Sequence, residues 1–171
     1  YSDEAKKKAG DLLINGDPLF EIKRELDRSI VGEDRRKLVE FLVALSAVRR
    51  DSEKALGMIC TSSSASGKSW SVNQILDLFP PELVLSYSRI TDSALNYLGK
   101  EGLEGKILFI QEAGGGADNP QLRVVLSEHG LNLLLTIPAG DGRFTTTEVR
   151  TNGCPAFFTT TTKPLSDDEL G

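Results

Sequence analysis

The chain has 171 residues, enough for one α/β domain with a sizeable core and too few for two. Hydrophobic residues make up 39% and charged residues 26%, proportions that exclude a disordered chain. The formal net charge of −5 excludes a molecule that is basic all over. Any contact with nucleic acid must therefore come from a local patch, or from one formed on oligomerisation.

The two cysteines and the N-terminus indicate the cellular compartment of the protein. Cys60 and Cys154 both stand among apolar residues, and we interpret them as reduced core residues of an intracellular protein. No apolar stretch reaches membrane-spanning length, and the polar N-terminus lacks the apolar core of a signal peptide. We therefore expect a cytoplasmic protein, and we expect this chain to be part of a longer polypeptide.

Turn signals and apolar periodicity predict the elements in chain order. Helices are expected at 3–15, 18–28 and 33–50, a strand at 55–60, a helix at 69–79, a strand at 82–87, a helix at 92–98, a strand at 106–110, a helix at 119–128 and a strand at 156–160. Before the last strand, segments 131–137 and 143–150 flank Pro138–Gly142, which is typical of a hairpin. Strands that alternate with helices indicate a parallel sheet with crossover helices.

Two of these helices have a predicted buried side. In the helix at 33–50, the apolar residues fall on one face: Leu38, Phe41, Leu42, Leu45 and Val48. In the helix at 69–79, the expected inward residues are Val72, Ile75, Leu76 and Phe79.

A phosphate-binding loop is predicted between the strand at 55–60 and the helix at 69–79. The pattern G-x-x-x-x-G-K-[ST] is matched at its end by Gly67, Lys68 and Ser69, while its first glycine is replaced by Ser62. In such a loop the backbone N–H groups and the helix N-terminus surround a polyphosphate. Lys68 would contact the β- and γ-phosphates and the Ser69 hydroxyl would bind Mg²⁺. The alternative is a serine-rich turn that caps a helix.

The predicted nucleotide-binding positions cover the loop and the residue after it: Ser62, Ser63, Ser64, Ala65, Ser66, Gly67, Lys68, Ser69 and Trp70. We expect Trp70 to pack under the loop.

An acidic residue follows the apolar strand at 106–110. Gln111 and Glu112 end this strand, and an ATPase needs a carboxylate at such a place to orient the attacking water or hold the magnesium water shell. Glu112 fits the first role. Gln111 stands where an aspartate is usual, and its neutral side chain can reach Mg²⁺ only through a bound water. The alternative is an ordinary solvated loop.

Four threonines, residues 159–162, end the strand that begins at 156. A polar side chain at this strand tip can position the attacking water or contact the γ-phosphate. Because successive side chains alternate between two faces, only some of the four can do so. We favour Thr161, with Thr162 next. The alternative is that the threonines are present for their strand propensity alone.

The order of these segments resembles a known family. "SIVGEDRRKLVEFLVALS", "TSSSASGKSW", "LDLFPPE", "SRITDSALNYL", "KILFIQEA" and "TTTTKP" are together similar to the AAA+ ATPase domain of helicase-like proteins. More narrowly, they resemble those of phages and mobile elements that often accompany a DNA primase. The resemblance extends from Ile30 to Pro164.

The resemblance implies roles for particular residues. Ile30, Val31 and Gly32 would lie against the adenine, Lys68 and Ser69 would bind phosphate and Mg²⁺, Glu112 would be the catalytic carboxylate, and Thr161 or Thr162 the sensor. It also implies a ring-shaped homo-oligomer that couples ATP hydrolysis to movement on DNA. Ser62 and Gln111 depart from the general pattern of the family. The lid and its arginines would follow Gly171.

The hairpin is the second place where the resemblance implies a function. Hairpins inserted at this point in AAA+ helicases contact DNA, so the tip residues Gly140, Gly142 and Arg143 are expected to do so here. The alternative is a hairpin that only packs or mediates a subunit contact.

The sequence thus predicts an α/β P-loop core of the AAA+ type with a parallel sheet. A helical extension would occupy residues 1–29, the ATPase core 30–165 with the hairpin at 131–150, and the start of a lid 166–171. The expected activity is Mg²⁺-dependent ATP hydrolysis by a DNA helicase or translocase, in replication of a phage or mobile element, with a primase as a further partner. One alternative is a nucleotide-gated assembly or loading module with little hydrolysis. Another is a small-molecule kinase on the same core.

Overall fold

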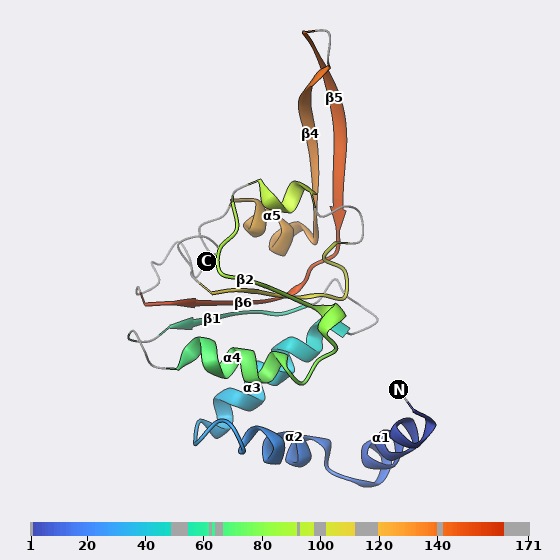
Figure 1. Cartoon of the computed structure of the whole chain (residues 1–171), viewed down its shortest axis with the longest axis vertical. Coiled ribbons are helices and arrows are strands. Elements are labelled where there is room, and N and C mark those ends of the chain that lie inside the picture. The colour runs from blue at the N-terminus through green and yellow to red at the C-terminus, as the bar shows by residue number, and fades with distance from the viewer. Residues whose placement is uncertain are drawn as a thin grey trace.

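The computed structural model describes residues 2–48, 55–61, 63, 67–91, 93–97, 102–111, 120–139 and 142–162 of the chain. At its centre is a four-stranded parallel sheet (Figure 1). The strands are β1 (Gly57–Thr61), β2 (Val84–Tyr87), β3 (Ile107–Ile110) and β6 (Ala156–Thr161). Their spatial order is β1-β6-β3-β2, so the last strand of the sequence lies between the first and the third. All four residues of β3 are buried, as expected for a strand covered on both faces.

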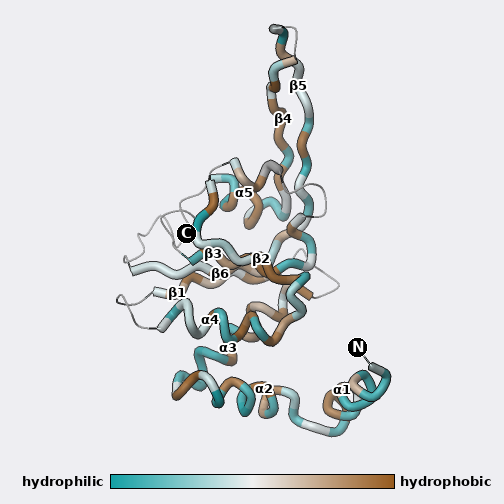
Figure 2. Tube along the Cα trace, in the orientation of Figure 1, coloured by the Kyte–Doolittle hydropathy of each residue, from teal (hydrophilic) through white to brown (hydrophobic). Residues whose placement is uncertain are grey.

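Helices cover both faces of this sheet (Figure 1). The helices α3 (Asp34–Leu45) and α4 (Lys68–Leu76) lie on one face, and α5 (Pro120–Glu128) lies on the other. Each face has its own hydrophobic cluster, and the adjacent β6 residues Phe158 and Phe157 belong to the α3–α4 cluster and the α5 cluster respectively. Figure 2 shows hydrophobic residues in the helices on both sides of the sheet. This arrangement confirms the predicted α/β fold.

Two further helices precede the sheet. In α1 (Asp3–Asn15) the backbone N–H of Ala5 donates to the Ser2 hydroxyl, and in α2 (Pro18–Leu26) that of Phe20 donates to the Asp17 carboxylate. Both helices therefore begin with a side-chain N-cap. No residue of α1 is buried, and Figure 1 shows this helix lying apart from the sheet.

The predicted hairpin is present and is longer than expected. Its strands β4 (Gly130–Ala139) and β5 (Arg143–Asn152) pair antiparallel and project from the body (Figure 1). Hydrophobic and hydrophilic residues alternate along it (Figure 2). Its base is attached to a short 3₁₀ helix, η4 (Ala94–Tyr97), because the Thr151 hydroxyl donates to the Leu95 carbonyl at 3.1 Å.

Two local expectations were met only in part. Of the helix expected at 92–98, the described residues form the short 3₁₀ helix η4, whose Ala94 N–H bonds to the Thr91 carbonyl in a tight turn. In α3, Phe41 is buried as expected, but Leu42 and Leu45 are 45% and 39% exposed. The charged residues Lys37 and Glu40 are instead fully buried. The two charged side chains are paired with oxygen and nitrogen groups of other residues, which the apolar pattern does not reveal.

Within the described part of the chain, no helix is both long and apolar enough to cross a bilayer. The buried cysteines expected from the sequence are confirmed, since Cys60 and Cys154 are both buried and form no disulfide.

Candidate functional site

The end of the phosphate-loop motif lies at the start of α4. Gly67 precedes the helix with φ +77° and ψ +10°, a left-handed conformation that glycine adopts without strain. A Cβ added to Gly67 would meet no atom within 4 Å, so the backbone conformation rather than crowding favours glycine here. Ser62 and residues 64–66 lie outside the described residues, and the effect of serine at the first motif position stays a prediction.

The side chain of Lys68 folds back toward the loop. It is only 7% exposed, and its Nζ donates to the carbonyl oxygen of Ser63 at 2.8 Å. A buried ammonium group must have oxygen partners, and a backbone carbonyl of the loop supplies one. The Lys68 ammonium is therefore held at the loop.

The N-terminus of α4 has no side-chain cap among the described residues. The first intrahelical bond runs from the Ser71 N–H to the Gly67 carbonyl at 2.9 Å, and the N–H groups before it have no partner within the helix. These groups form the positive end of the helix dipole, which favours an anion. The donor set of Lys68, the Ser69 hydroxyl and this helix end fits a polyphosphate with its magnesium ion.

Two hydroxyl groups connect α4 to the middle of the sheet. The oxygens of Ser69 and Thr160 lie 3.4 Å apart, and Thr160 Oγ1 donates to the carbonyl of Gln111. Because a carbonyl only accepts, the single hydroxyl proton of Thr160 is used there, and Thr160 can only accept from Ser69. The hydroxyl proton of Ser69 then points to Thr160, and the lone pairs of the Ser69 oxygen can bind another partner.

The threonines at the end of β6 divide between the two faces of the sheet. Phe158 packs in the α3–α4 cluster, so Thr160, two residues later, faces α4, whereas Thr161 faces the side of α5. Thr162 follows the strand and is exposed. Thr160 was missed by the sequence analysis, and the alternation from Phe158 was the signal that could have found it. Sensor roles for Thr161 and Thr162 stay predictions.

Gln111 is fixed through its backbone at the end of β3. Its N–H donates to the Tyr87 carbonyl of β2 at 3.0 Å, and its own carbonyl accepts from Thr160 of β6. The side chain of Gln111 is half-buried. Glu112 lies outside the described residues, so its role as the catalytic carboxylate stays a prediction.

The segment expected at the adenine lies just before α3. Ile30 is 7% exposed and belongs to the same hydrophobic cluster as Val72 of α4, while the Val31 side chain is 95% exposed. Gly32 has φ +72°, in the left-handed region that favours glycine. The segment is thus anchored by Ile30 and presents Val31 to solvent.

Trp70 does not pack under the loop as expected. It is 59% exposed, because α4 turns Ser71, Val72 and Ile75 toward the interior and leaves Trp70 on the opposite side. Its indole is therefore close in sequence to Ser69 and open to solvent.

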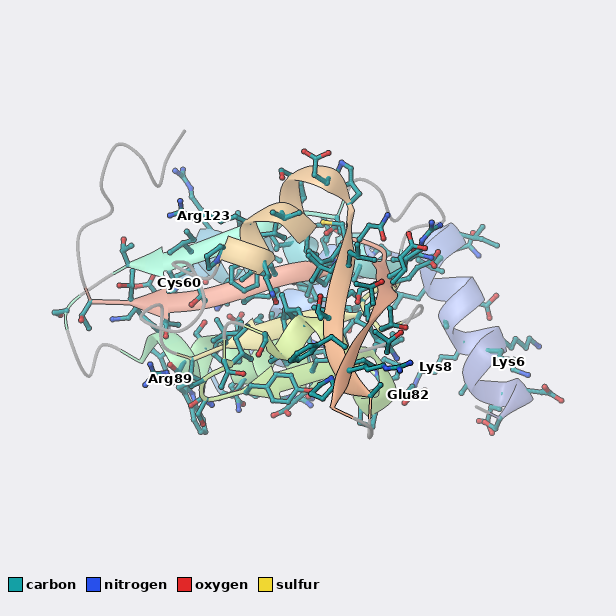
Figure 3. The ribbon with its side chains drawn as sticks, turned by 90° about the horizontal axis from the view of Figure 1, so that it is seen from above. Lys6, Lys8, Cys60, Glu82, Arg89 and Arg123 are labelled. Carbon is teal, nitrogen blue, oxygen red and sulfur yellow. The ribbon has the colours of Figure 1, made fainter. Side chains whose placement is uncertain are left out.

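A buried carboxylate that the sequence analysis did not single out lies beside the first turn of α4. Glu40 of α3 is fully buried, and its two oxygens accept from the Ser71 hydroxyl of α4 at 2.6 Å and from Arg36 Nε at 2.7 Å. Cys60 of β1, labelled in Figure 3, lies 3.8 Å from Glu40 Oε1. Burial first, and then this carboxylate, raise the pKa of the Cys60 thiol to about 11. The network ties α3, β1 and α4 together.

The tip of the hairpin combines an arginine with an aromatic ring. Arg143 begins β5 beside Gly142, whose φ is +80°, and Phe144 is 73% exposed. Gly140 and Asp141 lie outside the described residues. Nearer the base, the Arg150 guanidinium forms an ion pair with Glu148 at 2.7 Å. Phe144 was not singled out from the sequence, where it reads as an ordinary strand residue.

The lysines of α1 lie far from the phosphate loop. Lys6 and Lys8 belong to a helix on the side of the molecule opposite to the carboxyl ends of β1 and β6, in both the first view and the view from above (Figures 1 and 3).

Among the described residues, no three His, Cys, Asp or Glu side chains form a group that could hold a metal ion. The described part of the candidate site consists of hydroxyl, ammonium and backbone groups.

Comparison with known families assigns the chain to one of them. The family model described as the MTBMA_p00010 P-loop domain matches residues 3–125, which is more than half of the chain. The chain belongs to this P-loop domain family. No curated protein matches the chain.

Solved structures agree with the fold. A full-length MCM homolog from Methanopyrus kandleri has a TM-score of 0.62 and 15% sequence identity, and the match covers 99% of this chain and 39% of that one. The apo A form of the NrS-1 C-terminal region has a TM-score of 0.47 and 20% identity, over 91% of this chain and 39% of that one. At 15% identity, the similarity to the MCM homolog shows the fold alone. The similarity to the NrS-1 region is too low to support any further conclusion. This chain spans about two fifths of the length of each.

Proposed function

We propose that this P-loop domain binds Mg·ATP at the N-terminus of α4 and hydrolyses it. The observation that carries the proposal is the meeting of Lys68 and Ser69 with Thr160 and the Gln111 carbonyl at the carboxyl ends of β1, β6 and β3. Ligands of parallel α/β sheets bind at this edge.

Lys68 and Ser69 would make the contacts to the triphosphate and its metal ion. The Lys68 ammonium would exchange the Ser63 carbonyl for the β- and γ-phosphate oxygens, so that it stays paired while buried. Ser69, whose proton is directed to Thr160, would turn its lone pairs to Mg²⁺. The bound Mg²⁺ supplies positive charge against the phosphate oxygens. The N–H groups of the first turn of α4 would add further donors.

Glu112 would orient the water that attacks the γ-phosphate. It follows Gln111 directly, and the Gln111 backbone is held by bonds to both neighbouring strands. Gln111 itself would contact the metal through a bound water. Thr161 or Thr162 would contact the γ-phosphate at the end of β6. Positioning and charge stabilisation supply most of the catalysis in phosphoryl transfer, and these residues would act in that way.

The intact protein would use this hydrolysis as a ring-shaped DNA helicase or translocase, in replication of a phage or mobile element, where a primase would be a further partner. The hairpin would contact single-stranded DNA with Gly140, Gly142 and Arg143 at its tip. The exposed ring of Phe144 would stack on a base, a contact that needs few positive charges. This suits a chain whose net charge is −5.

One observation favours a second candidate function. The end of β3 carries the neutral Gln111, which attracts a cation less strongly than a carboxylate. A nucleotide-gated module that assembles a ring or loads a partner, with slow hydrolysis, would use the same loop.

Turnover of ATP by variants distinguishes these functions. The full chain should release phosphate from Mg·ATP, faster with single-stranded DNA, and Glu112→Gln should lower kcat about 100-fold while Mg·ATP binding stays the same. Glu128→Gln, on the exposed end of α5, is the matched control and should behave as the wild type. Binding without turnover in the wild-type chain would favour the module. Equal turnover in wild type and Glu112→Gln would contradict the catalytic role of Glu112.

A further inference from the structure

A fully buried lysine holds the segment that precedes α3. Lys37 is 0% exposed, and its ammonium has four oxygen partners: the carboxylates of Asp27 and of Asp34 at 3.0 Å, and the carbonyls of Ile30 at 3.4 Å and Gly32 at 2.9 Å. Burial lowers the pKa of this ammonium, but the hydrogen bonds to Asp27 and Asp34 outweigh burial and raise it. Lys37 is therefore charged, and its ammonium links the two carboxylates to the carbonyls of Ile30 and Gly32.

The two carbonyls that Lys37 binds lie on either side of Val31. Within the described part of the chain, the peptide N–H and C=O of Val31 have no hydrogen-bond partner, and its side chain is 95% exposed. The next two residues are both left-handed, Gly32 at φ +72° and Glu33 at φ +55°. A left-handed glutamate is strained by about 1 kcal/mol and persists only where its surroundings hold it. The contacts of Lys37 supply that restraint.

The same helix is also attached to the phosphate-loop helix. Glu40 lies one helical turn after Lys37, and its carboxylate accepts from the Ser71 hydroxyl at 2.6 Å. Ser71 is two residues beyond Ser69 on α4. Through α3, the Val31 peptide and the start of α4 thus have a fixed relation, as a base site and a phosphate site of one nucleotide require.

We propose that Lys37 is a positioning residue that sets nucleobase selectivity, by orienting the Val31 peptide toward the edge of adenine. This rests on the proposed function. Adenine presents the N6 amino group as a donor beside the N7 acceptor, and the backbone of one residue, such as Val31, offers a matching C=O and N–H from the peptide groups on its two sides. Guanine presents O6 where adenine has the amino group, so two acceptors would face each other. Selectivity for adenine then depends on how the Val31 peptide is turned, and Lys37 fixes the carbonyls on both sides of it.

Binding of three ligands by the full chain tests this. Dissociation constants for ATP, GTP and inorganic tripolyphosphate are measured by calorimetry, each with Mg²⁺, for the wild type and Lys37→Met. The wild type should prefer ATP over GTP. In Lys37→Met the affinity for ATP should fall about tenfold, as loss of one or two hydrogen bonds implies, and the preference should disappear. Tripolyphosphate has no base, and its affinity should change less than about twofold.

Lys23→Met is the matched control. Lys23 is paired with the same two carboxylates, Asp27 at 2.9 Å and Asp34 at 3.4 Å, and no contact with the carbonyls of residues 30 and 32 is seen in the described part of the chain. It should keep the preference for ATP. An equal loss of preference in Lys23→Met would overturn the proposal, because charge alone would then explain the effect.

The remaining outcomes also decide the matter. If Lys37→Met binds all three ligands as the wild type does, or loses ATP and tripolyphosphate equally, the residue has no role in selectivity. If Lys37→Met does not fold, Gly32→Ala replaces it, since a Cβ there meets no atom within 4 Å and only the left-handed φ is disturbed. Gly32→Ala should reduce the preference for ATP and keep tripolyphosphate binding, and an unchanged preference would overturn the proposal. A wild-type chain that binds neither ATP nor tripolyphosphate would refute the proposed function itself, and this inference with it.

Discussion

Two fully buried charged side chains of the described residues lie on α3. Lys37 and Glu40 are both fully buried, and each has partners on a different segment: the turn before α3 for the lysine, and α4 for the glutamate. A buried charge without partners would destabilise the fold by several kcal/mol, so these contacts must persist in the folded state. The two side chains therefore determine where α3 lies relative to its neighbours.

The carboxylate of Glu40 has a measurable effect on Cys60. Because burial and then Glu40 raise the pKa of the Cys60 thiol from 9.0 to about 11, the unfolded chain loses this proton at a lower pH than the folded chain does. The thiol's contribution to stability is complete below pH 9.0 and is lost as the pH rises toward about 11. We expect the free energy of unfolding in urea to fall by ~2 kcal/mol over this range through Cys60.

The control for this prediction is Cys60→Ala, which should lose that part of the pH dependence. Below pH 9 the folded wild-type chain should also react slowly with a thiol reagent. A Cys60 that reacts at pH 8 as fast in the folded chain as in urea would show that it is neither buried nor protonated.

At the level of residues, the sequence predicted the side chains that belong to a motif and missed those defined by packing. Lys68 and Ser69 follow from the phosphate-loop pattern, and the structure places both at the start of α4. Thr160 and Glu40 have no motif. To predict Thr160, one must know which residues of β6 face α4, and the packing of Phe158 settles this. To predict Glu40, one must know that α3 buries charged residues. For this reason the apolar periodicity of α3 identified the buried Phe41 but wrongly placed Leu42 and Leu45 on the buried face.

Most residues in the projecting part of the hairpin are exposed to solvent. A two-stranded hairpin is at best marginally stable alone, and the described contacts that hold this one lie near its base, where Leu131 and Thr151 are buried. Toward the tip, Leu134 and Phe144 are 72% and 73% exposed. The projecting part is thus free to meet a ligand or a neighbouring subunit.

We predict that Phe144→Ala weakens binding of single-stranded DNA about tenfold, because stacking of a base on an aromatic ring contributes 1–3 kcal/mol by rough estimate. The affinity for DNA is measured by the fluorescence anisotropy of a labelled oligonucleotide, with the full chain saturated with Mg·ATP. Leu134→Ala is the matched control, since it is equally exposed but lies farther from the tip. An equal loss of DNA affinity in both variants would mean that the substitutions destabilise the hairpin. No loss in either variant would mean that DNA binds elsewhere on the protein.

Most elements were predictable from the sequence, and the failures have a local cause. The turn at Pro138–Gly142 and the alternating strands beside it identified the hairpin, and the apolar run before Gln111 identified β3. The helix expected at 92–98 became the short η4, which is fixed by the buried Leu95 and by its contact with Thr151 at the hairpin base. Such a tertiary contact has no signature in the local sequence.

At the scale of the whole molecule, strand order brings the site together. Because β6 lies between β1 and β3, the ends of three strands distant in sequence meet beside the start of α4. The alternation of strands and helices predicted a parallel sheet, and the pairing of β3 with β6 puts the threonine strand beside the strand that ends before Gln111. The hairpin and α1 project away from this edge (Figure 1).

The central claim, that the start of α4 binds Mg·ATP, is tested most directly by titrating Mg·ATP into the full chain and into Lys68→Ala. Trp70 is one residue past Ser69 and 59% exposed, so its fluorescence should report binding, with calorimetry on the same samples. We predict saturable binding by the wild type, an affinity at least about tenfold lower in Lys68→Ala, and no change in the surface control Lys6→Ala. Equal affinities in the wild type and Lys68→Ala, or no binding by the wild type, would contradict the account.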